Sequence, residues 1–131
     1  MWRKVLTAAV ALAVTATIPL LPTAAQAKPA SCFLPTDWNG WAPAKGGDAL
    51  YLKVGLHDIY QVDLTPGSRV RKGAGDFLVT SSHGSHWICS ALDLEGMAIS
   101  DDIGMKRPLI PSNLRKLSPE EVAAIPRKDL P

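Results

Sequence analysis

The feature that most constrains the fold is a pair of short segments, residues 49–54 and 59–64, in which apolar and polar residues alternate. Alternation with a period of two is typical of a β-strand that buries one face. The apolar positions are Leu50, Leu52, Val54, Tyr60, Val62 and Leu64. A hairpin that pairs Val54 with Tyr60, Leu52 with Val62 and Leu50 with Leu64 places all six on one face, with its turn centred on residues 56–58.

Other segments add to this hairpin. Residues 76–80 and 86–94 are predicted to form two more strands around a turn at residues 81–85, and residues 96–100 a short fifth. Residues 65–75 are predicted to be a loop because of their glycine and proline content. Near the end of the chain, Ser118, Pro119 and Glu121 form a capping box with proline at the first helical position, which predicts a short helix that stops at Pro126.

The first 27 residues have the pattern of a secretory signal peptide. Arg3 and Lys4 precede a long apolar run, and Ala25 and Ala27 occupy the small-residue positions before a cut at Lys28. The alternative is a membrane anchor, but the run is at the short limit for a span and contains prolines near its end. We therefore expect residues 28–131 to be a single exported domain, periplasmic or secreted, with no membrane span after cleavage.

Both cysteines, Cys32 and Cys89, lie in the predicted mature chain. In an oxidising compartment they leave one intramolecular pairing, so a Cys32–Cys89 disulfide is predicted, with two free thiols as the alternative. The expected fold class is therefore mainly β (α+β): a small antiparallel sheet of about four to five strands, one disulfide and a short C-terminal helix.

Charge limits the class of partner. Arg3 and Lys4 account for the formal charge of +2, so the mature chain has equal numbers of basic and acidic residues. This balance argues against nucleic acid and anionic membrane surfaces, which proteins recognise through a basic field. A basic cluster at Arg69, Arg71 and Lys72 is interpreted as a solvated turn.

Aromatic residues are the main candidates for contact with a partner. Asn39-Gly40 between Trp38 and Trp41 is a tight-turn signal that would place two indoles beside the turn. With Trp87 and Tyr51 these residues could stack on sugar rings or on a partner's side chains. The alternative is that the rings pack around the disulfide.

Histidines suggest a metal site as an alternative function. His83 and His86 are close in sequence, and His57 lies in another turn. Zinc requires three or four ligands in tetrahedral geometry, and this loop supplies at most half of them. A serine hydrolase built on the same loop with Asp76 is a further alternative, although the sequence has no nucleophile-elbow motif. No catalytic residue and no cofactor are predicted.

Four stretches, SCF at 31–33, WNGW at 38–41, WICSALDL at 87–94 and LSPEEVAAIP at 117–126, resemble a family of small exported proteobacterial proteins of unassigned function. The resemblance implies no catalytic residue. The sequence thus predicts an exported, non-catalytic binding or accessory module of the cell envelope whose partner is an envelope protein or a glycan. The alternatives are a periplasmic metal-binding protein with a His-Gly-Ser-His loop, and a small hydrolase.

Overall fold

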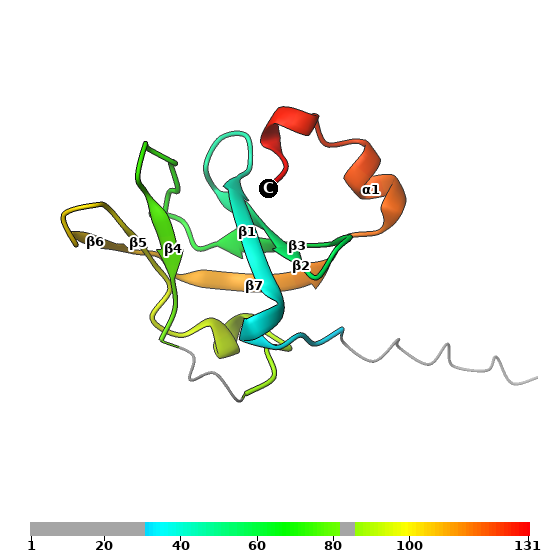
Figure 1. The fold of residues 1–131 in the computed structure, drawn as a ribbon, viewed down its shortest axis with the longest axis horizontal. Helices are drawn as coiled ribbons and strands as arrows, with labels where there is room; N and C mark the ends of the chain where they lie inside the picture. The colour runs from blue at the N-terminus through cyan, green and yellow to red at the C-terminus, as the bar shows by residue number, and fades with distance from the viewer. Residues whose placement is uncertain (1–30, 82–85) are drawn as a thin grey trace, which may run out of the picture.

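A computed structural model describes residues 31–81 and 86–131. The predicted signal peptide, its cleavage site and His83 lie outside the described residues. The fold is mostly β, with two antiparallel sheets, one disulfide and one short α-helix, which confirms the expected class (Figure 1). The strands divide between a four-stranded and a three-stranded sheet rather than forming a single one.

The larger sheet has the strand order β1-β2-β3-β7. Its strands are β1 (Trp38–Pro43), β2 (Ala49–Val54), β3 (Asp58–Leu64) and β7 (Pro111–Lys116). The predicted hairpin is β2–β3, and the six alternating apolar side chains are all buried on one face. The alternation therefore identified both the strands and the face that packs into the core.

The predicted register of this hairpin is wrong by two residues. Leu52 pairs with Tyr60, Leu50 with Val62, and Val54 with Asp58. The reason is the turn: Gly55 adopts a positive φ of 59°, which lets a three-residue loop reverse the chain. A shift of two residues keeps each side chain on its face, so the alternation could not distinguish the two registers.

The predicted tight turn at Asn39-Gly40 is also wrong, because both residues belong to strand β1. Neither has a positive φ, and the pairing with β2 shifts between Trp38 and Gly40, which makes Asn39 a β-bulge. The Asn39 side-chain amide donates to the Gly55 carbonyl at 2.7 Å, and the Trp38 indole donates to the Gly40 carbonyl at 2.9 Å. Side-chain hydrogen bonds thus hold the bulge.

The smaller sheet has the order β4-β5-β6 and consists of β4 (Phe77–Val79), β5 (Ala98–Ser100) and β6 (Lys106–Pro108). Strands β4 and β5 confirm two predicted strands. Strands β6 and β7 were not predicted, because KRP and PSNLRK show no apolar alternation. Both are edge strands, where proline and charged residues are common and a buried face is not required.

The predicted strand over residues 86–94 is absent. Ile88 forms only an isolated bridge with Phe33, and the chain then turns into the 3-10 helix η2 (Ala91–Leu94). A capping box causes the change: the Asp93 carboxylate accepts the Ser90 N–H at 2.9 Å, and Ser90 is the N-cap.

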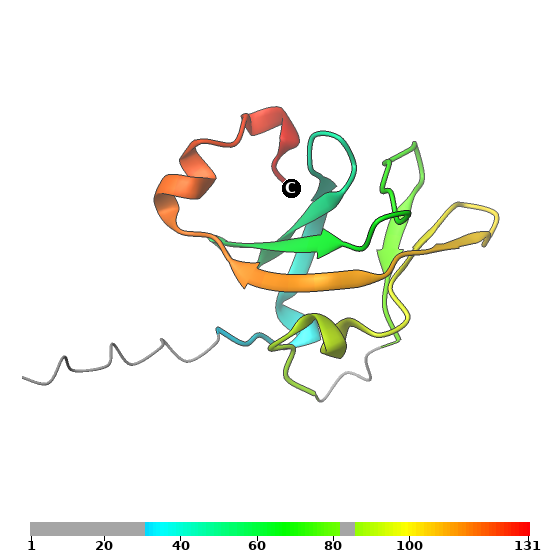
Figure 2. The same cartoon turned by 180° about the vertical axis from the view of Figure 1, so that it is seen from behind.

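The C-terminal helix α1 (Pro119–Ala123) begins as predicted. The Ser118 hydroxyl accepts the Glu121 N–H at 3.2 Å, and the Glu121 carboxylate accepts the Ser118 N–H at 2.8 Å. Two further 3-10 turns are η1 (Pro35–Asp37) and η3 (Arg127–Asp129). The segment with α1 and η3 lies on one side of the four-stranded sheet and η2 on the other (Figures 1 and 2).

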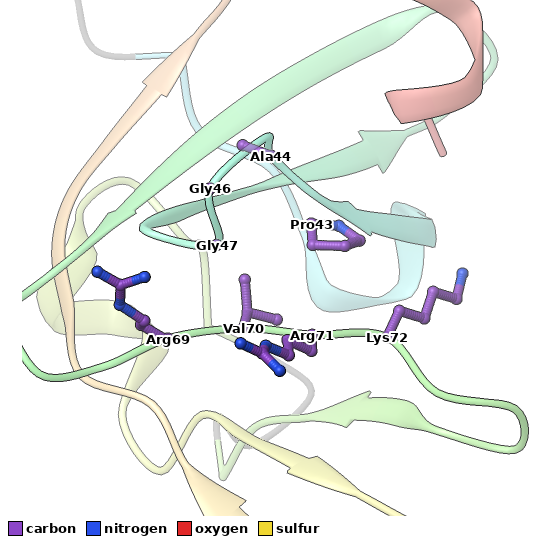
Figure 3. Close-up of a pocket in the computed structure, with 8 residues that line it drawn as sticks. All are labelled: Pro43, Ala44, Gly46, Gly47, Arg69, Val70, Arg71 and Lys72. Carbon is purple, nitrogen blue, oxygen red and sulfur yellow. The ribbon is translucent and has the colours of Figure 1, made fainter.

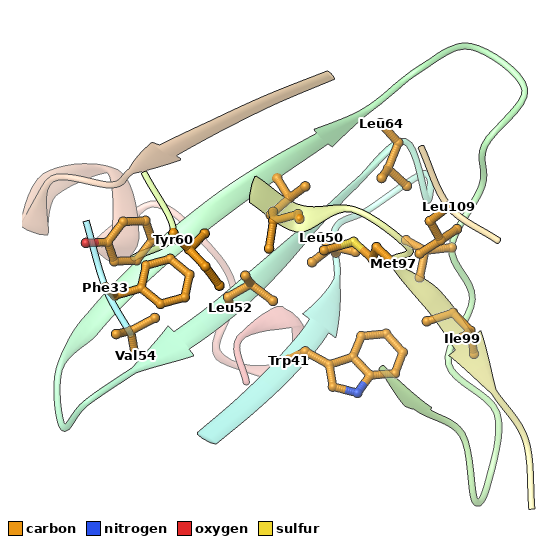
Figure 4. Close-up of a cluster of buried hydrophobic side chains, with 14 residues drawn as sticks. Phe33, Trp41, Leu50, Leu52, Val54, Tyr60, Leu64, Met97, Ile99 and Leu109 are labelled. Carbon is orange, nitrogen blue, oxygen red and sulfur yellow. The ribbon is translucent and has the colours of Figure 1, made fainter. Parts of the chain in front are cut away.

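One buried cluster joins the two sheets. It contains the inward side chains of β2 and β3 together with Phe33, Trp41, Val70, Ile88, Leu94, Met97, Ile99 and Leu109 (Figure 4). Six of these fourteen residues, Phe33, Val70, Ile88, Leu94, Met97 and Leu109, come from loops and the segment around η2. This explains how a chain with short strands buries a continuous apolar interior.

Candidate functional site

The disulfide is present as predicted, between Cys32 and Cys89. Next to it, the Phe33 N–H donates to the Ile88 carbonyl at 3.0 Å and the Ile88 N–H donates to the Phe33 carbonyl at 2.8 Å. Together the covalent bond and these two hydrogen bonds fasten the start of the described chain to its middle. A disulfide is consistent with an oxidising, extracellular compartment.

A hollow of about 370 Å³ opens beside this disulfide. We call it the Trp87 hollow; its lining includes Cys32, Phe33, Asp37, Val54, Leu56, His57, Asp58, Tyr60 and Trp87. The floor is apolar because Phe33, Val54 and Tyr60 are core residues. On the rim, by contrast, Trp87 is 58% exposed and Leu56 is 81% exposed.

The aromatic floor of the hollow is fixed in place. The rings of Phe33 and Tyr60 meet at a centroid distance of 4.7 Å and an interplanar angle of 57°, a tilted arrangement that aromatic pairs favour. Burial raises the pKa of the Tyr60 hydroxyl, and the nearby Lys116 ammonium partly opposes this shift. The hydroxyl therefore stays protonated and neutral at physiological pH.

The rim of the hollow is acidic, with Asp37 and Asp58. Asp58 forms an ion pair with Lys116 at 3.1 Å, and both side chains are partly exposed. Within the described residues, the Asp37 carboxylate has no hydrogen bond or ion pair. Asp37 is therefore the carboxylate that is available to a basic group on a partner.

The structure separates the four aromatic residues that the sequence put forward. Only Trp87 lines the hollow. Trp41 is 8% exposed and belongs to the core, and Trp38 is partly buried against it. Tyr51 lies in β2. The pKa of its hydroxyl is raised mainly by burial and further by the nearby Asp129 carboxylate. Trp87 thus has the geometry of a contact residue, whereas Trp41 has that of a core residue.

A second hollow, of about 410 Å³, lies where the loop after β3 passes the turn between β1 and β2 (Figure 3). Its lining includes Gly46, Gly47 and the basic residues Arg69, Arg71 and Lys72. The sequence pattern of this cluster predicts a solvated turn. All three basic side chains are exposed, as that interpretation expects, and what it missed is that they border a hollow together with the turn between β1 and β2.

The metal alternative requires at least three ligands close together. In the part of the chain that the structure describes, no group of three histidine, cysteine, aspartate or glutamate side chains is placed to hold a metal ion. His57 lines the Trp87 hollow, and His86 is exposed. Cys89 forms the disulfide with Cys32.

The hydrolase alternative requires Asp76 as the acid of a triad. The Asp76 carboxylate instead forms an ion pair with Arg107 at 2.7 Å and accepts the Gly73 N–H at 2.8 Å.

No family model, curated protein or solved structure matches this chain. Within residues 31–81 and 86–131, no helix has the length and apolar character needed to cross a membrane.

Proposed function

We propose that this chain is an exported, non-catalytic binding module of the cell envelope, and that it holds a protein partner at the Trp87 hollow. The observation that supports this function most directly is the exposure of Trp87 and Leu56 on the rim of one hollow. Large apolar side chains left in water cost free energy, and their presence around a concave surface usually marks a binding site.

The hollow suits a side chain of a protein partner. Tryptophan is enriched among the residues that dominate binding energy at interfaces, especially beside a pocket that excludes water. The floor formed by Phe33, Val54 and Tyr60 would contact an aliphatic or aromatic group. Asp37 on the rim would attract a lysine or arginine next to that group, and the Trp87 ring face can contact the same cation.

The proximity of the disulfide supports the same function. Cys32 and Phe33 both line the hollow. Cys32 is joined to Cys89 by the disulfide, and Phe33 exchanges two backbone hydrogen bonds with Ile88. Trp87 directly precedes this fastened pair. A contact residue on fixed backbone loses little conformational entropy when a partner binds, which favours affinity.

The test compares two substitutions of equally exposed leucines. The protein exported from its full sequence is purified in oxidised form, and a partner captured from the envelope is identified, purified and titrated back by calorimetry. Leu56→Asp and Trp87→Ala are each expected to weaken binding at least tenfold. Leu92→Asp is the matched control, because Leu92 is 82% exposed and does not line the hollow.

Three results would contradict the proposal. The first is equal loss of affinity in Leu56→Asp and Leu92→Asp, since this would indicate a general solubility effect. The second is unchanged affinity in Trp87→Ala. The third is turnover of generic ester or glycoside substrates by the purified protein, which would favour the hydrolase alternative.

A further inference from the structure

The hollow beside Arg69 and Arg71 continues into a neighbouring one. The neighbouring hollow, of about 420 Å³, is lined by Trp41, Lys128, Leu130 and other residues of β1 and the C-terminal segment, and it shares Pro43 and Lys72 with the first. We call the two together the β1 groove. It follows the free side of β1, which is an edge strand of the larger sheet.

The charge of the β1 groove has one sign. Four basic side chains line it, those of Arg69, Arg71, Lys72 and Lys128, and no aspartate or glutamate does. Among the described residues, the ion pairs lie elsewhere and join Arg107 to Asp76, Arg115 to Glu121 and Lys116 to Asp58. The predicted mature chain, residues 28–131, has equal numbers of basic and acidic residues, yet it concentrates unpaired positive charge along one strip.

The strip rests on fixed backbone. Val70 is buried, and its N–H donates to the Gly47 carbonyl at 2.8 Å. A Cβ atom at Gly47 would lie only 2.6 Å from the Val70 carbonyl oxygen, so this close approach requires glycine. Figure 3 shows the Val70 side chain pointing toward Gly47 and the Arg71 side chain pointing to the other side of the segment, whereas the Arg69 side chain extends on the same side as Val70. The backbone between the two arginines is therefore anchored at Val70 by its hydrogen bond to Gly47 and by burial.

Lys72 is also held in position. Its ammonium donates to the Trp41 carbonyl at 3.1 Å and lies 5.0 Å from the centre of the Trp41 ring. This hydrogen bond occupies an outward carbonyl of β1, and Pro43 has no N–H to offer, so the edge of β1 is poorly suited to pairing with another strand. A ligand of the groove would bind through charge rather than by extending the sheet.

We infer that the β1 groove binds an acidic polysaccharide, a site distinct from the Trp87 hollow. Single contacts between exposed charges are weak, so a useful affinity requires a ligand with repeated acidic groups that engages several basic side chains together. Apart from its basic residues, the first hollow is lined by proline, alanine and glycine residues and by the buried Val70. In the neighbouring hollow Trp41 is 8% exposed and Leu130 is partly buried. The groove therefore has no large, well-exposed apolar side chain to anchor a peptide, whereas a hydrated sugar chain needs no such anchor.

The test titrates the purified, exported protein with polygalacturonate, a polymer of acidic sugars, and with dextran as an uncharged polysaccharide. Polygalacturonate is expected to bind and dextran is not, and binding should weaken steeply as salt is added. Arg69→Gln/Arg71→Gln is expected to weaken binding at least tenfold, and Lys128→Gln by a smaller factor. Lys106→Gln/Lys116→Gln is the matched control, because it removes the same charge outside the groove.

Several outcomes would overturn this inference. Equal weakening in the control variant would show a general charge effect, and absence of binding by the folded wild type would exclude the ligand. Tighter binding to vesicles with anionic lipid than to polygalacturonate would identify a membrane surface instead. Trp87→Ala should leave polysaccharide binding unchanged, so failure of the protein-partner proposal and failure of this one are distinguishable. Thermal unfolding of each variant verifies that it is folded.

Discussion

The surroundings of Trp41 and Trp87 show how the same residue type serves two purposes in one small fold. Trp41 lies in β1 and belongs to the buried cluster, and the Lys72 ammonium lies over its ring. Trp87 lies beside the disulfide, where its neighbour Ile88 enters the core and leaves the indole in water. One tryptophan stabilises the sheet, and the other is available to a partner.

The difference arises from the backbone on either side of each residue. Regular pairing with β2 from Gly40 to Pro43 fixes the direction of Trp41, so its ring is directed into the interior. Around Trp87 the chain is held by the isolated β-bridge between Phe33 and Ile88 and by the Cys32–Cys89 disulfide. Ile88 is buried there, and Trp87 before it stays exposed. Local pairing therefore decides whether an aromatic residue becomes core or surface.

Truncation of the two tryptophans should separate these regions most clearly. Trp41→Ala removes a large buried ring and is expected to lower the free energy of unfolding by about 3–5 kcal/mol. Trp87→Ala removes a largely exposed ring, and the change should stay within roughly 0.5–1 kcal/mol. Urea denaturation followed by far-UV circular dichroism measures both. Similar losses in the two variants would contradict the distinction between core and contact residue.

The region around β2 and β3 was the most predictable part of the fold. Six alternating apolar residues specify strands and a buried face, and Ser118 and Glu121 specify the start of a helix from local hydrogen bonds alone. The register could not be predicted, because it depends on the conformation of Gly55 and the alternation is unchanged by a two-residue shift.

The surfaces were harder to predict than the strands. Asn39-Gly40 carries a strong turn signal, yet pairing with β2 and the hydrogen bond from Asn39 to Gly55 hold it as a bulge. The contact of Lys72 with Trp41 joins residues 31 positions apart, and no local pattern indicates it. Trp87 was among the candidates, but its exposure follows from the bridge between Phe33 and Ile88.

Removal of the disulfide tests how far the Trp87 region depends on covalent bonding. The disulfide joins two cysteines that are 57 positions apart in the sequence. Cys32→Ser/Cys89→Ser removes this cross-link and is expected to lower the free energy of unfolding by about 2–4 kcal/mol. Urea denaturation with and without a thiol reductant measures this. The wild type should lose stability when reduced and the double variant should not respond. A wild type that is equally stable in both conditions would show that the hydrogen bonds at Phe33 and Ile88 suffice.

The smallest expected effect concerns the acid that shapes the chain after Cys89. The Asp93 carboxylate accepts the N–H groups of Cys89 and Ser90, which lowers its pKa below the ordinary value of 3.8. A lowered pKa in the folded state contributes stability above the unfolded pKa, and this contribution is lost as the pH falls through the folded pKa. The wild type should therefore lose more stability than Asp93→Asn between pH 5 and about pH 3.

This difference should be less than about 1 kcal/mol, because the Asp93 side chain is exposed and solvent screens its charge. Chemical denaturation at a series of pH values measures it. Leu92→Ala changes an exposed neighbour in η2 without removing a titrating group, so it controls for any general effect of substitution in this helix. Parallel pH profiles for the wild type and Asp93→Asn would mean that the capping box of η2 is not what orders the chain beside Trp87. The fixed backbone of the proposed contact residue would then depend on the disulfide and the bridge to Phe33 alone.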